Sequence, residues 1–289
     1  MNKPIIIADI GQNHNGNLET AKEMIRVLAH YCKVDYVKFQ KRCPKELLTP
    51  EQYDKLYDNP NSFGKTYGEH REALEFTIDQ HAELKAECEK QGIKYSCSVW
   101  DMTSAKEIAS LNPDYIKIPS AINTNLGMIE WLVKNYTGQI HVGLGMTTFD
   151  EKVNIWNVIE SRNPDFIPYL CTSSYPCEFK DIHLISLDIS KFLARSDFLL
   201  DTSVTGFSGH HKGIAIDIAA YTLGATWIER HFTLDRTQKG TDHACSLEPD
   251  GMRRLVRDLN ATHQALAYKP KEILDCELEA REKMKWKPK

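Results

Sequence analysis

Short apolar runs alternate along the chain with longer segments in which apolar residues recur at helical spacing. Strands are expected at residues 5–8, 34–40, 93–98, 115–118, 139–144, 166–171, 204–207 and 226–230. Helices are expected at residues 18–30, 78–91, 103–111, 126–135, 149–161, 182–193, 213–223 and 252–268. Each expected strand is therefore followed by an expected helix.

Strands that alternate with helices pair in parallel, because each helix carries the chain back to the start of the next strand. Eight such units in about 250 residues match the size of a (β/α)8 barrel. We predict this TIM barrel over residues 1–268, with a charged C-terminal helix or linker over 269–289. A doubly wound open sheet is the alternative, but residues 11–16 (GQNHNG) lack the GxGxxG spacing of a dinucleotide-binding turn.

One segment breaks the alternation, between the second expected strand and the helix at 78–91. Residues 42–76 are rich in Pro, Asn, Tyr and Gly. We predict an irregular excursion with helical turns. Because long loops in compact domains are often functional, it is a candidate lid or substrate loop.

Composition narrows the class of partner. Hydrophobic residues make up 42% and charged residues 26%, which is typical of a globular enzyme-sized domain. A net charge of -4 argues against nucleic acid or an anionic membrane as a partner. No apolar run approaches the roughly 20 residues that span a bilayer. The eight scattered cysteines form no CxxC pair, which predicts free thiols and a cytoplasmic protein.

In a TIM barrel the chemistry lies at the carboxyl ends of the strands. Polar residues at these ends include Asp9, Lys38, Gln40, Ser98, Lys117, Ser120, Ser208, His210, Glu229 and His231. Two lysines and several hydroxyls on one rim predict a pocket for a small, highly charged anion such as phosphate. The alternative is that each lysine extends to solvent along the strand end.

The two histidines at strand ends suggest a metal site. His210 and His231 follow neighbouring strands, so both side chains can face the same barrel mouth. With Asp242 or Asp9 they form a donor set suited to Mn²⁺, Mg²⁺ or Zn²⁺. The alternative is that both are hydrogen-bonded structural residues. His14 and His243 are weaker candidates, and we treat His211 as a loop residue.

Several of these segments together resemble motifs of the sialic acid synthase family. Residues 6–16 are similar to its opening AEIGxNHxG motif, 38–40 to KFQ, 115–120 to YKIxS, 145–146 to GM, 171–176 to CTSxYP, 208–210 to SDH, 228–233 to IEKHFT and 240–243 to GPDH. The matches occur in order and cover about residues 4–265.

The resemblance implies a TIM-barrel transferase that joins phosphoenolpyruvate to an N-acetylmannosamine-like aldose, with release of phosphate and a need for Mn²⁺ or Mg²⁺. By position, His210 and His231 would bind the metal and, with Asp9, serve catalysis. Phosphoenolpyruvate would be held by Lys38, Ser98, Lys117, Ser120 and Ser208. The sugar would be held by Gln40, Tyr175, Asp242 and Asn61.

The chain departs from the family pattern at three residues. Asp9 stands where the family has a glutamate, and Ile122 stands where it has a second one. Gly209 replaces the aspartate before the first metal-binding histidine, which removes a carboxylate from around the metal. The family also usually carries a C-terminal antifreeze-like domain that reaches across a dimer. The resemblance therefore allows a homodimer here, and the loop at 55–72, which contains Arg71, is a candidate substitute for that domain.

Two alternatives remain beside this synthase. The same chemistry could act on a different aldose or on an aldose phosphate. A barrel that binds sugar and metal without catalysis is the other alternative, because Ile122 and Gly209 depart from the pattern. Release of phosphate from phosphoenolpyruvate distinguishes them.

Overall fold

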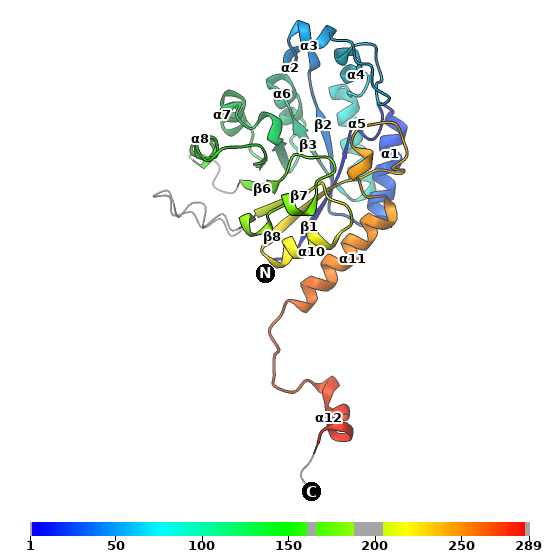
Figure 1. The fold of residues 1–289 in the computed structure, drawn as a ribbon, viewed down its shortest axis with the longest axis vertical. Helices are drawn as coiled ribbons and strands as arrows, with labels where there is room; N and C mark the ends of the chain where they lie inside the picture. The colour runs from blue at the N-terminus through cyan, green and yellow to red at the C-terminus, as the bar shows by residue number, and fades with distance from the viewer. Residues whose placement is uncertain (1, 161–165, 188–204, 287–289) are drawn as a thin grey trace.

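The computed structural model describes residues 2–160, 166–187 and 205–286 of the chain. Eight parallel strands pair in sequence order and close into a barrel, from β1 back to β8 (Figure 1). The strands are β1 (Ile5–Gly11), β2 (Tyr36–Lys41), β3 (Lys94–Val99), β4 (Tyr115–Ile118), β5 (Gln139–Gly143), β6 (Ile167–Cys171), β7 (Thr205–Gly209) and β8 (Ala225–His231). The predicted (β/α)8 barrel is confirmed.

Helices cover the outside of the barrel, as Figure 1 shows. They are α1 (Leu18–Arg26), α5 (Ile78–Gln91), α6 (Met102–Ser110), α7 (Leu126–Asn135), α8 (Phe149–Glu160), α10 (Ala215–Thr222) and α11 (Pro249–Ala265). The chain after α1 continues into a π-helical turn at Val27–Cys32. Of the helix predicted at 182–193, the structure contains a short 3-10 helix at Leu184–Leu187, and residues 188–193 lie outside the described residues.

Local signals explain where these helices begin and end. The side chain of Thr77 accepts a hydrogen bond from the Gln80 backbone amide, and the Gln80 side chain accepts one from the Thr77 backbone amide, which forms a capping box at the start of α5. Gly92 ends the helix with φ of 71°, a left-handed conformation that glycine adopts without steric cost. The side chain of Asp101 caps α6 in the same way as Thr77 caps α5. The helices then pack on outward-facing strand residues to form the main hydrophobic core.

The barrel interior is closed at its lower end, where the strands begin, by an aromatic plug. The plug consists of Ile7, Tyr36, Tyr115, Ile167, Tyr169 and Trp227. The His141 ring stacks on Tyr115 with ring centroids 3.8 Å apart, and its Nδ1 lies 2.9 Å from the Tyr169 hydroxyl. Because successive side chains of a strand face opposite sides, the next inward residue of each strand lies above this plug. The polar residues further along the strands therefore lie toward the carboxyl ends.

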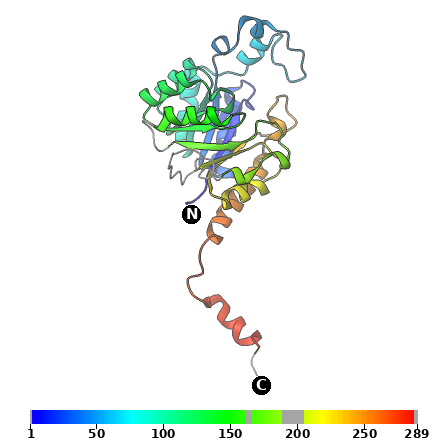
Figure 2. The same cartoon turned by 60° about the vertical axis from the view of Figure 1, so that its left-hand side comes forward.

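The predicted excursion between β2 and α5 contains three short helices. They are α2 (Pro44–Leu47), α3 (Pro50–Asp54) and α4 (Tyr67–Glu72). They stand beyond the end of β2, as both Figure 1 and Figure 2 show. A capping box between Thr66 and Glu69 starts α4, which fixes the position of Arg71 one turn later.

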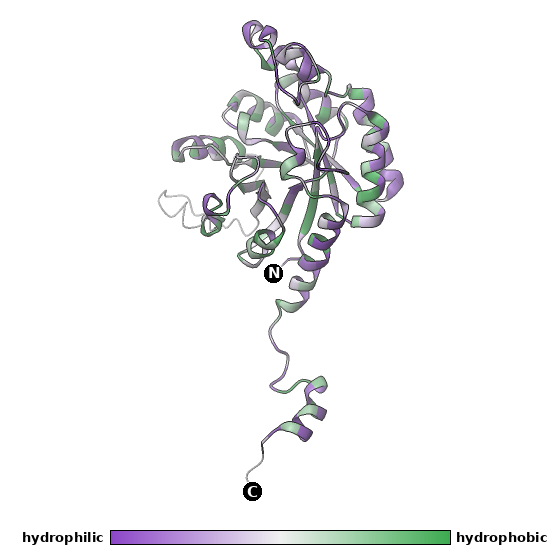
Figure 3. Ribbon diagram, turned by 45° about the vertical axis from the view of Figure 1, so that its right-hand side comes forward, coloured by the Kyte–Doolittle hydropathy of each residue, from purple (hydrophilic) through white to green (hydrophobic). Residues whose placement is uncertain are grey.

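The two ends of the barrel segment lie close together. The Tyr221 hydroxyl on α10 donates to the backbone carbonyl of Asn2, 3.0 Å away, and lies 2.7 Å from Nδ1 of His263 on α11. Beyond α11 the chain extends away from the barrel to α12 (Leu278–Met284), which carries both polar and apolar residues (Figure 3). Within the described residues, no helix combines the length and apolar character that a membrane crossing requires.

The close approach of the Gly206 backbone to the Tyr169 ring leads to a prediction about stability. A Cβ at Gly206 would lie 2.5 Å from two ring carbons of Tyr169, which is fully buried in the plug. Gly206→Ala is therefore expected to destabilise the fold by about 1–3 kcal/mol, since the ring must move within a packed interior. Urea unfolding monitored by circular dichroism measures this loss. Gly127→Ala is the control, because its Cβ meets only Asn125 Oδ1 at 3.9 Å; an equal loss in both variants would contradict the argument.

A second prediction concerns pH. His81 is fully buried with Nδ1 2.8 Å from the Tyr95 hydroxyl, and burial, with smaller effects of Lys41 and His14, lowers its pKa to about 3. As the pH falls, His81 therefore binds a proton in the unfolded chain before it does so in the folded protein. The folded state loses stability as the pH falls below about 6.5. From pH 7 to pH 5 this group should cost about 2 kcal/mol.

His81→Gln removes that proton uptake while keeping a hydrogen-bonding side chain. We expect the free energy of unfolding to fall less steeply with acidification in the variant than in the wild type. Urea titrations at several pH values measure both slopes. Parallel slopes would show that His81 does not titrate on unfolding.

Candidate active site

A cavity of about 210 Å³ opens at the carboxyl ends of the strands. It is lined by Asp9, Gln12, Lys38, Gln40, Arg71, Ser98, Trp100, Lys117, Pro119, Ser120, Cys171, Tyr175, Ser208, His210, Glu229, His231, Thr241 and Asp242. All of the predicted site residues except Asn61 are in this lining. The structure thus brings together residues that the sequence separates by more than 200 positions.

Strand register places the central residues beside one another. Asp9 on β1 is aligned with Lys38 on β2 and, on its other side, with His231 on β8. Ser208 on β7 is aligned with Glu229 on β8. Because aligned residues of neighbouring strands face the same side of the sheet, these groups all point into the barrel mouth.

Four buried charges form the floor of the cavity. Lys38 Nζ donates to Asp9 Oδ2 at 2.6 Å and to Ser98 Oγ at 2.8 Å. Lys117 Nζ donates to Glu229 Oε1 at 2.6 Å, and Lys38 Nζ lies 3.7 Å from the same oxygen. The Ser208 hydroxyl also donates to Glu229 Oε1, at 3.0 Å. Two ammonium groups and two carboxylates therefore balance one another out of contact with bulk water.

The pairing decides which protonation states are stable. Burial alone would raise the pKa of Glu229, but Lys117 and Lys38 outweigh it and hold the pKa well below its usual range. Burial alone would lower the pKa of Lys38, but the charges of Asp9 and Glu229 outweigh it and raise the pKa. Glu229 and Lys38 are therefore charged at neutral pH.

Glu229 has a larger part in this floor than the sequence indicated. It was visible as a polar residue at the end of a strand, two positions before His231 and on the same face. That spacing gave no indication that it pairs with Lys117, which lies 112 positions earlier in the chain. The pairing follows from closure of the barrel, which brings β4 and β8 to opposite sides of one interior.

The two histidines face each other above this floor, with ring centroids 5.4 Å apart. His210 Nδ1 lies 2.8 Å from the Thr172 carbonyl, so that nitrogen carries the proton and Nε2 is left as a free electron-pair donor. Burial, reinforced by the neighbouring His231, lowers the pKa of His210 to about 3. His210 is therefore a neutral imidazole at neutral pH, the form that binds metal ions.

The donor set fits a divalent cation with an incomplete protein shell. Among the described residues, no three His, Cys, Asp or Glu side chains are grouped closely enough to hold a metal on their own. Asp9 Oδ1 is buried without a hydrogen-bond partner, and Asp9 Oδ2 lies 3.8 Å from His231 Nε2. Two imidazoles with a carboxylate beside them could hold an ion whose remaining positions are filled by water or substrate.

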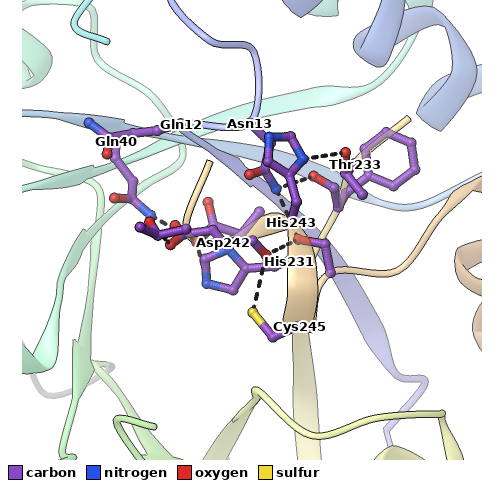
Figure 4. Close-up of polar contacts among 12 residues, drawn as sticks. Gln12, Asn13, Gln40, His231, Thr233, Asp242, His243 and Cys245 are labelled. Carbon is purple, nitrogen blue, oxygen red and sulfur yellow. Dashed lines mark hydrogen bonds and ion pairs between the residues drawn. The ribbon is translucent and has the colours of Figure 1, made fainter. Parts of the chain in front are cut away.

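Asp242 extends from the loop after β8 toward His231 (Figure 4). Its Oδ2 lies 3.9 Å from His231 Nδ1, and its Oδ1 accepts a hydrogen bond of 2.9 Å from the Thr241 hydroxyl. Burial opposes ionisation of Asp242, but His231, the Thr241 hydrogen bond and two nearby guanidinium groups lower its pKa overall. Asp242 is thus a charged acceptor at the outer part of the cavity, opposite the lysines.

The wall beside Asp242 is built from β2, the turn after β1 and the excursion. Gln40 Oε1 accepts from Arg42 at 2.5 Å, which leaves the Gln40 amide nitrogen directed toward Asp9 at 3.4 Å. Arg71 donates to the Tyr67 hydroxyl and, at 3.1 Å, to Gln12 Oε1. Within the part of the chain that the structure describes, Arg71 forms no ion pair, in contrast to the two lysines of the floor.

Three residues singled out in the sequence lie elsewhere. Asn61 does not line the cavity; its side-chain oxygen accepts a hydrogen bond from the Gly240 amide at 3.1 Å, so it contacts the rim loop. Ile122 packs against the main hydrophobic core, and no carboxylate takes its place in the lining. A Cβ at Gly209 would lie 2.8 Å from the His211 ring, so an aspartate there would displace His211.

His211 lies in the loop between β7 and α10, as predicted, but it is not solvent-exposed. Its side chain is fully buried, 3.3 Å from Asp217 Oδ2, which also pairs with Arg230 at 2.6 Å. This cluster lies on the outer side of β8, because Arg230 alternates with the inward-facing Glu229 and His231. His14 and His243 are also buried, His14 stacked on Phe76 and His243 bonded to Thr233.

Known proteins are similar to this chain over most of its length. The human N-acetylneuraminate-9-phosphate synthase is 37% identical over 96% of this chain and 76% of its own length. The N,N'-diacetyllegionaminic acid synthase of Campylobacter jejuni is 31% identical over 92% of this chain and 78% of its own length. The crystal structure of a sialic acid synthetase from Leptospira borgpetersenii in complex with citrate superposes with a TM-score of 0.78 at 26% identity, covering 99% of this chain and 94% of that one.

The family assignment follows from the extent of these matches. The sequence matches the NeuB family over residues 24–271, which includes every strand from β2 to β8. The expectation of an enzyme of the sialic acid synthase type is confirmed at the level of the family. The chain belongs to the NeuB family.

Proposed function

We propose that this protein condenses phosphoenolpyruvate with an N-acetylmannosamine-like aldose, forms a nonulosonic acid and releases phosphate. The observation that carries the proposal is the buried floor, in which Lys38 and Lys117 stand among three serine hydroxyls beneath a pair of histidines. Membership of the NeuB family and the names of its synthase relatives support the same reaction.

Phosphoenolpyruvate would occupy the floor of the cavity. Its phosphate and carboxylate would lie beside the ammonium groups of Lys38 and Lys117, and its oxygens would accept hydrogen bonds from Ser98, Ser120 and Ser208. The Ser120 hydroxyl is already oriented, since it accepts from the Gly145 amide at 3.1 Å. Donors fixed before the substrate arrives stabilise developing charge without further reorganisation.

The aldose would bind above, between the histidines and Asp242. His210 and His231 would hold Mn²⁺ or Mg²⁺, whose chemical contribution when bound is to polarise the aldehyde of the sugar. The sugar hydroxyls would form hydrogen bonds with Asp242, Tyr175 and the Gln40 amide. The aldehyde carbon would then face C3 of phosphoenolpyruvate across the cavity.

The reaction forms one C–C bond and consumes one water. C3 of phosphoenolpyruvate attacks the aldehyde carbon, water adds to C2, and phosphate leaves with the bridging oxygen. Asp9 would accept the proton of that water, because its Oδ1 has no hydrogen-bond partner, whereas Glu229, whose Oε2 is also without one, is held ionised between Lys117 and Lys38, and Ile122 cannot act as a base. The aldehyde oxygen gains a proton as the new hydroxyl.

A phosphorylated aldose is the second candidate acceptor. Arg71 lines the cavity, and among the described residues its hydrogen bonds go to two neutral partners, Tyr67 and Gln12, and it forms no ion pair. A guanidinium in that state is suited to a phosphate on the far end of the sugar. Three animal relatives, from human, mouse and fruit fly, are named N-acetylneuraminate-9-phosphate synthases, which favours this acceptor.

The first functional prediction is metal-dependent release of phosphate. Phosphoenolpyruvate with a panel of N-acyl hexosamines, free or 6-phosphorylated, should yield phosphate and a nonulosonic acid by mass spectrometry when Mn²⁺ is present. His231→Ala should lower kcat/KM by at least about 100-fold and weaken Mn²⁺ binding in equilibrium dialysis, because one imidazole donor is lost.

His30→Ala is the matched control, since His30 is exposed on the outside of the barrel and, among the described residues, its side chain bonds only Gln91. It should leave turnover and Mn²⁺ binding within about twofold, as expected of a substitution far from the site. If the wild type releases no phosphate with any member of the panel but still binds sugar, the barrel is a sugar-binding protein and the proposed reaction is wrong.

The second functional prediction concerns acceptor choice. Arg71→Ala should lower kcat/KM for N-acetylmannosamine 6-phosphate by about 10- to 100-fold, because a charge-assisted hydrogen bond contributes roughly 1.5–3 kcal/mol. The loss for unphosphorylated N-acetylmannosamine should stay within about threefold, and Arg71→Lys should recover part of the phosphate-dependent activity. Equal losses for both sugars would remove the case for a phosphorylated acceptor.

A further inference from the structure

We propose that Asn13 is a positioning residue that fixes Asp242 and the end of β8 for binding the aldose, an inference that rests on the proposed function. Asn13 itself is not among the residues that line the cavity. Any effect that it has on the aldose must therefore pass through other groups. Figure 4 shows it beside Thr233 and His243, on the side of the site where Asp242 and His231 lie.

The Asn13 amide joins two segments that flank Asp242. Asn13 follows β1 and is 2% exposed. Its side-chain nitrogen donates to the Phe232 carbonyl at 2.9 Å, directly after His231, and to the Ser246 hydroxyl at 2.9 Å. The Ser246 hydroxyl in turn donates to the Asp242 carbonyl at 2.7 Å. One amide group thus links the end of β1, the end of β8 and the backbone of Asp242.

The loop that carries Asp242 needs such a link. Between β8 and α11 the chain leaves the barrel, and its base is held where the Leu247 amide donates to the His231 carbonyl at 2.8 Å. The only hydrogen bond to the Asp242 carboxylate that the described residues provide comes from its neighbour Thr241, which moves with the loop. The bond from Ser246 to the Asp242 carbonyl ties Asp242 itself, through Asn13, to the barrel wall, whereas other bonds of the loop hold His243 to Thr233 and Gly240 to Asn61.

The backbone at the end of β1 packs closely against Gln40, His231 and Asp242. A Cβ at Gly11 would lie 3.1 Å from the Gln40 amide nitrogen, 3.6 Å from His231 and 3.7 Å from Asp242. The turn that bears Asn13 therefore packs directly on the groups assigned to the aldose. The lysines assigned to phosphoenolpyruvate form no hydrogen bond with this turn in the described structure. Loss of the Asn13 amide should disturb aldose binding selectively.

The chain contains a matched asparagine on the other side of the barrel. Asn123 is also 2% exposed, and its side-chain nitrogen donates to the Gly143 carbonyl at 2.8 Å and to the Thr147 hydroxyl at 2.7 Å. It joins the segment after β4 to the segment after β5, far along the rim from Asp242. Asn13→Ala and Asn123→Ala therefore remove the same chemical group with the same kind of partners.

The experiment compares Asn13→Ala, Ser246→Ala and Asn123→Ala in the full chain by steady-state kinetics. The acceptor is N-acetylmannosamine or its 6-phosphate, whichever the wild type turns over faster. Asn13→Ala and Ser246→Ala should raise the KM for the acceptor by about 10-fold and leave the KM for phosphoenolpyruvate within twofold. Asn123→Ala should leave the KM for the acceptor within twofold.

A readout that does not need turnover separates this inference from the proposed function. Hydrogen exchange of residues 233–247, followed by mass spectrometry, should become about 10-fold faster in Asn13→Ala and Ser246→Ala and stay unchanged in Asn123→Ala. Unchanged exchange in Asn13→Ala, or equal rises of both KM values in Asn13→Ala and Asn123→Ala, would overturn the positioning role. A wild type that releases no phosphate refutes the reaction instead, and the exchange rates then decide whether Asn13 fixes the loop.

Discussion

Four charges buried inside a closed barrel constrain the rest of this molecule. Removing an ionised side chain from water costs several kcal/mol, which only close partners can offset. Asp9 with Lys38 and Glu229 with Lys117 meet this requirement at 2.6 Å each. Such short contacts between four different strands demand a fixed register around the whole barrel. The aromatic plug below and the helices outside hold that register in place.

The same balance sets the conditions for binding an anion. Each lysine already has a carboxylate partner, so an entering phosphate adds negative charge to a neutral cluster. The hydroxyls of Ser98 and Ser208, and any cation held by the histidine pair, offset that charge. Binding of the two substrates and of a metal should therefore be cooperative in electrostatic terms. This electrostatic coupling explains why the two lysines and the two histidines line the same cavity.

Hydrophobic periodicity was sufficient to predict the barrel. The apolar runs located every strand, and the structure moved their ends by only a few residues, such as the extension of β8 to His231. Strand-end position also indicated most of the cavity lining, because in a parallel barrel all carboxyl ends meet on one rim. Both features follow from the local pattern of apolar residues and from one general rule of parallel barrels, so a single sequence is enough to predict them.

What the sequence could not show are contacts between segments distant in the sequence. The position of Asn61 depends on how the excursion packs against the loop at Gly240, and no local pattern records that packing. His211 is a loop residue as predicted, but its burial could not be predicted because it depends on Asp217 and Arg230 from two other elements. Glu229 was recognised as a polar strand-end residue, whereas its pairing with Lys117 required the closed barrel.

Tyr221 gives the barrel one more property. Its hydroxyl touches both the backbone of Asn2, just before β1, and His263 near the end of α11. The first and last elements of the (β/α)8 unit are thus separated by little more than one side chain. A short peptide linker could join them and new ends could be opened in an exposed loop, since proximity of termini is what circular permutation requires. The active site of this barrel should therefore assemble even when the chain begins at a different strand.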